Sequence, residues 1–510
     1  MGEDKPKKLS RRQFLKESAI TGAALSLSSF WGVTSRGKKR KVVKVGTRAP
    51  SKIVPGLLND AAGQTIGQTF GDYLFRLQGE EQKRGPSLVE HYDSSTDKKE
   101  WTFKVREGVK FHHGTELTSK DVIYTFNRIL DPDLGSPAKS VFSNVDDIKK
   151  VDKYTSQFVL KKPDPDFQLK FYNYNTTLVA HDYDYTKKKP SGTGAFKIKE
   201  RHPGEKIILE RHPDYFIPGL PKVDELHFVI VPEVSTQVLR LKSGDLQVAG
   251  PLGITQFKEL ERNKKTNALV TPGAFHAPIS MRTDQPPFND NRVRRAMKYC
   301  VDRERMVEAI TAGTGDMGHD HPVWEGYQWY KDLGTRTRDI AKAKELLAQA
   351  GHEDGLDVSL YYQSDRTDSM DTALNFQQMA KPAGINVKLV GSTSDVYYSK
   401  YWLKVNLMCT HWAHRVDIRN LLNLAYKSGA SWNEGHYSNK ELDRHIEAAS
   451  YSIKPEERQK HFTEIQKIIR QEGHVIIPSF QGLYGGSTKK VEDVWIMRSG
   501  GLELRHINYV

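Results

Sequence analysis

Residues 101–112 read Trp-Thr-Phe-Lys-Val-Arg-Glu-Gly-Val-Lys-Phe-His, and residues 117–126 read Leu-Thr-Ser-Lys-Asp-Val-Ile-Tyr-Thr-Phe. The first five residues alternate apolar and polar side chains, which predicts a strand. Gly108 and Gly114 stand where turns require a positive φ. Thr118 and Asp121 have the spacing of a capping box, and apolar residues then recur at helical spacing. We therefore expect a strand, a turn and a helix over 118–130, ending before Asp131-Pro132.

The same alternation of β-rich runs and helical patterns continues along the chain, which predicts an α/β fold. A length of 510 residues exceeds the ~250–300 residues at which one core stops growing, so we expect at least two lobes. Strands are expected at 42–46 and 226–231, a hairpin at 192–199 and 206–210, and helices at 235–241, 289–312, 340–350 and 455–470.

The net charge of +14 is concentrated at the N-terminus, because residues 1–41 hold eleven basic and three acidic residues. Beyond residue 41 the two signs nearly balance, and no basic stripe interleaved with aromatics stands out. Nucleic acid is therefore not an expected partner.

Residues 9–16 read Leu-Ser-Arg-Arg-Gln-Phe-Leu-Lys, and an uncharged stretch over 18–33 follows. A basic head before an apolar segment this short is typical of a cleavable signal. The paired arginines before Phe-Leu-Lys resemble the twin-arginine export motif. We expect a signal peptide over 1–36, a basic linker over 37–41, and a periplasmic protein that meets the twin-arginine translocase during export.

Cys300 and Cys409 are the two cysteines of the chain, and neither has metal-ligand spacing. One disulfide is conceivable in an oxidising compartment. Since both residues fall on apolar patterns, two buried free thiols are the simpler interpretation.

Three blocks resemble the peptide- and nickel-binding family of ABC solute-binding proteins. They are residues 101–126, Gly192-Thr-Gly-Ala-Phe with the later Glu210-Arg-His-Pro-Asp-Tyr-Phe, and Pro287-Phe-Asn-Asp-Asn-Arg-Val-Arg-Arg-Ala followed by Val301-Asp-Arg. The similarity extends over nearly all of residues 42–510.

The resemblance implies a two-lobed periplasmic binding protein (type II, cluster C-like) with an extra domain inserted in the first lobe. On this basis we expect the first-lobe core at 42–80, 192–275 and 480–510, the inserted domain at 81–191 and the second lobe at 276–479. It implies a monomer, without cofactor or metal, that captures a small peptide-like or acidic solute between its lobes. The partner would be an ABC permease in the inner membrane.

Peptide receptors of the family carry a Trp-x-x-Asp motif whose acid takes the α-amino group of the ligand. Here Trp412 is followed three residues later by Arg415, and an acid appears only at Asp417. The planar guanidinium of arginine suits a carboxylate. Arg415 is therefore expected to bind an acidic group of the solute, while Asp417 or Asp395 balances its charge or meets an amine. The alternative is a surface or interlobe pair between Arg415 and Asp417.

Five further residues are candidates for ligand contact. Trp432, Asn433 and Tyr437 belong to a polar and aromatic loop that could stack on a solute or simply pack beneath the surface. Arg48 follows the first strand, and His411 precedes Trp412, where it could touch an anion.

Two other classes of function stay open. His319-Asp320-His321 and the pair His411 and His414 have metal-ligand spacing without an assignable third ligand, so a receptor for a metal chelate is one alternative. An exported hydrolase of peptides or glycans is the other, although Gly-x-Ser-x-Gly, His-Glu-x-x-His and Walker motifs are absent from the sequence.

Overall fold

A computed structural model describes residues 40–182 and 190–510. The predicted export signal lies outside the described residues, and so does most of the basic linker. None of the helices within these two ranges has the length and apolarity needed to cross a membrane.

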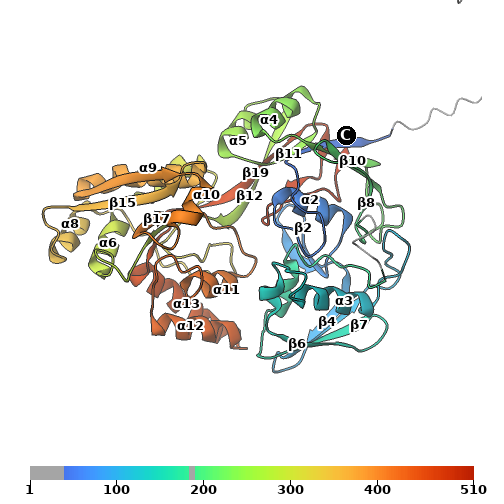
Figure 1. Cartoon of the computed structure of the whole chain (residues 1–510), viewed down its shortest axis with the longest axis horizontal. Coiled ribbons are helices and arrows are strands. Elements are labelled where there is room, and N and C mark those ends of the chain that lie inside the picture. Colours follow the sequence, from blue (N-terminus) through green and yellow to red (C-terminus); the bar gives the residue numbers. More distant parts are fainter. Residues whose placement is uncertain (1–39, 183–189) are drawn as a thin grey trace, which may run out of the picture. The chain divides into compact units, whose positions relative to one another are not determined.

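The larger sheet is built around β1 (Val42–Thr47), which pairs in parallel with β10 (Glu225–Ile230) and β11 (Val248–Leu252). Its strand order is β12-β19-β11-β1-β10-β9-β8, with β14 also paired to β19. The predicted hairpin is present as β8 and β9. The remaining bounds are β8 Phe196–His202, β9 Lys206–Arg211, β12 Thr266–Phe275, β14 Asp316–Met317 and β19 Ser479–Thr488. Helices α2 (Ala61–Phe70), α4 (Val234–Ser243) and α5 (Ile254–Glu261) accompany it (Figure 1).

The block 101–126 forms part of a second, four-stranded sheet with the order β4-β5-β7-β6. Strand β5 (Glu100–Val105) and helix α3 (Ser119–Leu130) confirm the predicted strand and helix, and Thr118 and Asp121 form the capping box. Gly108 and Gly114 have φ values of 74° and 100°. The other strands are β4 Val89–Ser94, β6 Val145–Lys150 and β7 Thr155–Leu160.

A third sheet has the order β16-β15-β17-β13-β18. Its strands are β13 Ile279–Met281, β15 Leu356–Gln363, β16 Ile385–Ser392, β17 Leu407–Cys409 and β18 Val475–Ile476. Helices α8 (Ile340–Gln349), α9 (Thr367–Ala380) and α13 (Pro455–Glu472) belong to the same part, and α8 and α13 confirm two predicted helices.

The single helix predicted over 289–312 was wrong. The segment forms α6 (Asn291–Tyr299) and α7 (Arg303–Thr311). Asp302 separates them because its side chain accepts a hydrogen bond from the Arg305 amide at 3.1 Å and caps the second helix. The apolar periodicity continues past the break because both helices pack apolar residues into the same hydrophobic core.

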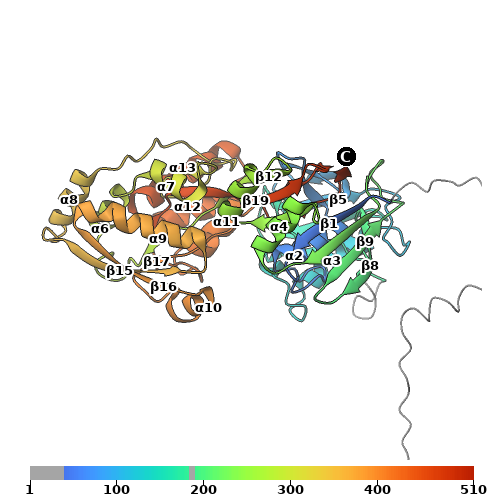
Figure 2. The ribbon, with the colours of Figure 1, turned by 90° about the horizontal axis from the view of Figure 1, so that it is seen from above.

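The chain passes twice between the first and third sheets. Strand β12 of the first sheet leads into β13 of the third, and β18 of the third leads into β19 of the first. In Figures 1 and 2, β12 and β19 lie between the two sets of elements. We call residues 276–478 lobe II and the rest of the described chain lobe I. The narrower boundaries drawn from the sequence stay a prediction.

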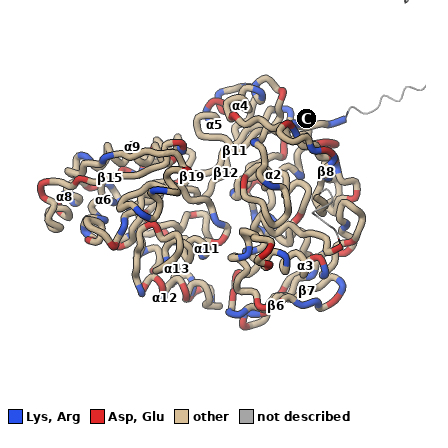
Figure 3. Tube along the Cα trace, viewed as in Figure 1, with Lys and Arg blue, Asp and Glu red and all other residues tan. Residues whose placement is uncertain are grey.

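Charges of both signs alternate along the backbone trace, without a stripe of one sign (Figure 3). This distribution agrees with the near balance of acidic and basic residues beyond residue 41. More than half of the excess positive charge of the sequence therefore belongs to its N-terminal segment.

Both cysteines are buried and free, which confirms the simpler interpretation of the sequence. Burial raises the pKa of Cys300 to about 12 and also raises the pKa of Cys409. We expect neither thiol to react with an aromatic disulfide reagent in the native protein, and both to react after denaturation. Absorbance titration of released thiolate checks this, and rapid labelling of the folded protein would contradict it.

Candidate functional site

A cavity of about 580 Å³ lies where lobe I, lobe II and the crossing strands meet. Lobe I contributes the end of β1 with Arg48 and the start of α2 with Asp60, and lobe II contributes residues 365–368 and His411. Phe275 of β12 and Gln481 of β19 complete the wall. Two of the predicted site residues, Arg48 and His411, therefore line this cavity, and we call it the cleft cavity.

Asp368 is the centre of a hydrogen-bond network in the cleft cavity. Its carboxylate accepts hydrogen bonds from His411 Nδ1 at 2.6 Å, Gln481 Nε2 at 3.0 Å and Arg366 Nη2 at 3.1 Å. Burial acts to raise the pKa of Asp368, but the bond from His411 and the nearby positive charges outweigh it and hold that pKa below its usual value. The network ties lobe II to the crossing strand β19 through Gln481.

Two more carboxylates line the cleft cavity. Asp60 caps α2 by accepting from the Gly63 amide at 2.7 Å, and Asp365 accepts from the Ser394 amide at 3.0 Å. Because each carboxylate has about four lone-pair positions, both retain the capacity to accept from an ammonium group. Arg48 and Arg366 also line the cavity, so it presents charges of both signs.

Phe275 separates the cleft cavity from a second group of residues. Its ring centroid lies 6.1 Å from that of His411 and 6.3 Å from that of His414. His414 accepts from the Ala274 amide at 3.2 Å through Nδ1. Burial, followed by the charges of three arginines, lowers the pKa of His414 to about 3, so its ring is neutral at pH 7.

Those three arginines, Arg84, Arg415 and Arg498, form what we call the arginine group. Arg84 Nη2 donates to the Val416 carbonyl at 3.0 Å, and Arg498 Nε donates to the Pro272 carbonyl at 3.0 Å. The main chain of Arg415 is held by Tyr327, whose hydroxyl donates to the Arg415 carbonyl at 2.6 Å.

The described residues hold no carboxylate that neutralises the arginine group. Across residues 40–182 and 190–510, none of its three members forms an ion pair with a carboxylate. Arg84 and Arg498 belong to lobe I and Arg415 to lobe II, so like charges face each other between the lobes. Such an arrangement favours an anion from outside.

The aromatic candidates lie in lobe II. Trp412 is buried, and its main chain pairs with that of His276 at the lobe crossing. Trp432 is 40% exposed and contacts Trp412 with ring centroids 5.9 Å apart. Beneath them, buried Glu434 accepts from Trp402 Nε1 at 2.9 Å and from Ser280 Oγ at 2.7 Å. Burial raises the pKa of Glu434.

Three predicted site residues make contacts that account for their polar groups within the fold. Asp417 is buried and pairs with Arg419, whose Nη2 lies 2.6 Å from its carboxylate. Asn433 Nδ2 donates to the Tyr437 carbonyl at 2.8 Å, and Tyr437 returns a bond from its amide to Asn433 at 3.1 Å. None of the three lines the cleft cavity.

One of the histidine patterns with metal-ligand spacing, His319-Asp320-His321, has Asp320 at its centre. Asp320 is buried between Arg303 and Arg336, at 2.6 and 3.2 Å. Within the part of the chain that the structure describes, no group of three or more histidine, cysteine, aspartate or glutamate side chains is placed to hold a metal ion.

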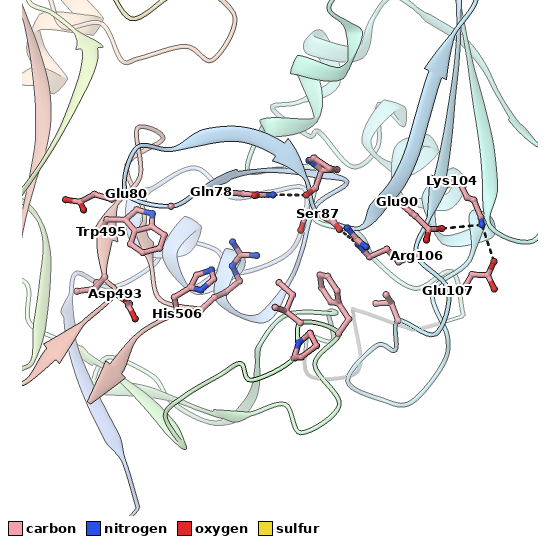
Figure 4. Close-up of a pocket in the computed structure, with 18 residues that line it drawn as sticks. Gln78, Glu80, Ser87, Glu90, Lys104, Arg106, Glu107, Asp493, Trp495 and His506 are labelled. Atoms are coloured by element: carbon pink, nitrogen blue, oxygen red, sulfur yellow. Dashed lines mark hydrogen bonds and ion pairs between the residues drawn. The ribbon is translucent and has the colours of Figure 1, made fainter. Parts of the chain in front are cut away.

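A larger cavity of about 1200 Å³ lies within lobe I, between the hairpin β2–β3 (Phe75–Gln78, Lys83–Pro86), β4, β5 and the C-terminal segment (Figure 4). Lys104 there pairs with Glu90 at 3.2 Å and Glu107 at 3.3 Å, and Arg106 donates to the Ser87 carbonyl at 2.8 Å. Because only one lobe contributes to this cavity, we place the candidate site in the cleft.

Comparison with known proteins agrees with this geometry. Residues 83–432 match the model of the bacterial extracellular solute-binding proteins, family 5. This chain belongs to that family. Its members are substrate-binding transport proteins of the periplasm or cell exterior.

The family 5 protein is 25% identical over 503 residues to the glutathione-binding protein GsiB of Pectobacterium atrosepticum, covering 96% of each chain. It is 25% identical to the ABC transporter substrate-binding protein CtaP of Listeria monocytogenes, with a TM-score of 0.80 over 89% of this chain and 95% of that one. HbpA2 of Haemophilus parasuis shares the fold, with 22% identity, a TM-score of 0.82 and coverage of 92% and 99%. The predicted two-lobed binding-protein fold is thus confirmed.

The sequence did not reveal Arg84, Arg366, Asp368 or Arg498 as site residues. Arg84 contacts a residue 332 positions away in the chain, and no local motif marks it. Only the return of the C-terminal segment to lobe I brings Arg498 beside it.

Proposed function

We propose that the family 5 protein captures a small peptide-like solute that carries a free acidic group and delivers it to an ABC permease in the inner membrane. The observation that carries this proposal is the arginine group, in which three arginines from two lobes act on His414 and, among the described residues, none forms an ion pair with a carboxylate.

The physical argument concerns the cost of bringing the lobes together. When the lobes close without a solute, the positive charges of Arg84 and Arg498 in lobe I approach that of Arg415 in lobe II. The repulsion between these like charges opposes closure. An acidic group between them converts the repulsion into charge-assisted hydrogen bonds. The solute therefore favours the closed population through contacts that exist only when both lobes are engaged.

The cleft cavity supports the peptide-like part of the proposal. Its acidic residues Asp60, Asp365 and Asp368 and its basic residues Arg48 and Arg366 suit the ammonium and carboxylate of one amino-acid head group. Phe275 lies between this cavity and the arginine group, so one solute can reach both sides of it. We propose that Arg415 binds the additional acidic group of the solute.

Glutathione is the first solute to test, because a relative bears the name glutathione-binding protein and because the molecule combines an amino-acid head with a separate glycine carboxylate. We expect calorimetry to show one glutathione bound per chain. Amidation of the glycine carboxylate should weaken binding at least about tenfold, since an amide keeps some hydrogen bonds but loses the charge.

One control distinguishes the charge of the solute from its size, and a second distinguishes binding of the solute from its cleavage. S-methylglutathione keeps both carboxylates and should bind as glutathione does. Mass spectrometry of the solute after prolonged incubation should return it unchanged, whereas cleavage products would favour the hydrolase alternative. Equal affinity for glutathione and its amide would contradict the acid-selective proposal.

Export and assembly complete the proposal. The twin-arginine pattern supports translocation by the twin-arginine pathway into the periplasm, followed by action as a monomer. Fusion of residues 1–41 to a reporter that requires folding before export tests the pathway. Replacement of Arg11 and Arg12 by lysine should abolish export of that reporter.

A further inference from the structure

A buried ion cluster joins lobe I to lobe II away from the cleft cavity. Asp164 and Asp166 of lobe I meet Arg419 and Arg458 of lobe II, and all four side chains are less than 10% exposed as residues. Arg419 Nη1 donates to Asp164 Oδ1 at 2.8 Å, and Arg458 Nη2 donates to Asp166 Oδ2. We call these four residues the interlobe cluster.

The two arginines of the interlobe cluster also make contacts within lobe II, and Asp164 makes a contact within lobe I. Arg419 and Arg458 also donate to the Ser450 and Ala449 carbonyls, at 3.2 and 3.1 Å, near the end of α12 (Lys440–Tyr451). On the opposite side, Lys170 lies 3.4 Å from Asp164. The guanidinium and carboxylate groups are therefore oriented before the lobes meet, so little side-chain entropy is lost on pairing.

Charge complementarity makes the cluster specific for the closed arrangement. With the lobes apart, Arg419 keeps its partner Asp417 and Asp164 keeps Lys170, whereas Arg458 and Asp166 lose the ion pair between them. Closure brings one surplus charge of each sign together in a buried place, where the attraction is stronger than at the surface.

One short loop connects the interlobe cluster to the arginine group. Arg415 belongs to the arginine group, and Asp417, two residues later, caps α11 (Ile418–Leu421) and forms a bidentate pair with Arg419. Val416 between them accepts from Arg84 of lobe I at 3.0 Å. A shift of this loop therefore changes both sets of contacts.

We propose that the interlobe cluster is a latch that stabilises the closed form and that the loop 415–419 couples it to solute occupancy. The coupling to occupancy rests on the proposed function, whereas the latch itself does not. Neutralising one acid should open the protein without solute and weaken solute binding by about tenfold, because closure must then be driven by the solute alone.

The test compares Asp164→Asn and Asp166→Asn with Glu447→Gln. Glu447 pairs with Lys162 between the same lobes at 4.0 Å, but both side chains are more than half exposed, so this pair contributes little. Lys149→Cys in lobe I and Lys440→Cys in lobe II provide exposed labelling positions, while the native cysteines are buried. Spin-label distance distributions are measured with and without glutathione, and circular dichroism verifies folding.

Without solute, we expect longer distances in Asp164→Asn and Asp166→Asn and an unchanged distribution in Glu447→Gln. Unchanged distances in both latch variants would overturn the latch. If distances lengthen while the dissociation constant for glutathione is unaltered, the coupling is overturned. If wild type binds no glutathione, the proposed solute class fails, and the solute-free distances still decide the latch. Should one variant not fold, the other decides.

Discussion

Replacement of Arg415 by alanine is expected to weaken glutathione binding by about 100-fold, or about 2.7 kcal/mol. Arg415 is the lobe II member of the arginine group, so its loss removes the contact that lets one anion bridge both lobes. Charge-assisted hydrogen bonds to a carboxylate in a confined site contribute about 1.5–3 kcal/mol. Calorimetry at constant ionic strength measures the change.

A double-mutant cycle between protein and solute identifies the group that Arg415 binds. The Arg415→Ala variant should lose little affinity for the glycine amide of glutathione, because the partner charge is already absent. Arg415→Lys should be intermediate, since lysine keeps the charge and loses the planar fork. Exposed Arg305, without a side-chain ion pair in the described structure, provides the matched control Arg305→Ala. Equal losses for both solutes would contradict the assignment.

Acidification is expected to destabilise the protein strongly between pH 7 and pH 4. Five histidines, three of them buried and two half-buried, have pKa values lowered by burial, to about 3 for four of them and about 4 for the fifth. They are His112, His321, His414, His474 and His276. Their unfolded pKa is about 6.5, so below that pH the unfolded chain binds protons that the folded protein rejects.

The sign follows from this difference in proton binding. The folded pKa is the lower one, so stability is complete above about pH 7 and decreases as the pH falls towards 4. At pH 5 each histidine costs about 2 kcal/mol, and the sum for five, about 10 kcal/mol, lies within the 5–15 kcal/mol that keeps typical domains folded. Glu434 and Asp72, whose pKa values are raised mainly by burial, act in the opposite direction and offset part of the loss.

Urea unfolding at pH 5, 6, 7 and 8 measures this dependence. His321→Leu removes one titrating group without removing a hydrogen bond, because neither ring nitrogen of His321 has a hydrogen-bond partner among the described residues. Its unfolding free energy should change about 2 kcal/mol less between pH 7 and pH 5 than that of the wild type. His91→Leu, at an exposed position, is the control and should leave the pH dependence unaltered. A flat profile for the wild type would contradict the prediction.

Local patterns were sufficient to predict much of the fold. The alternation at 101–105 and the capping box at Thr118 lie within a few residues of each other, so short-range interactions decide them. The helix break at Asp302 was missed because a capping aspartate inside an unbroken apolar period leaves a weak signal. Polar capping there outweighs the propensity of the surrounding residues.

The sequence by itself determined the family, the α/β class and the unusual arginine at position 415, since each depends on residues that are close together in the chain. Only the tertiary structure decided which residues surround Arg415. It also decided that Asp417 pairs with Arg419 instead of lining the cleft cavity. Arg84 reaches Val416, beside Arg415, because the chain crosses twice between two sheets, and no short-range interaction encodes that proximity.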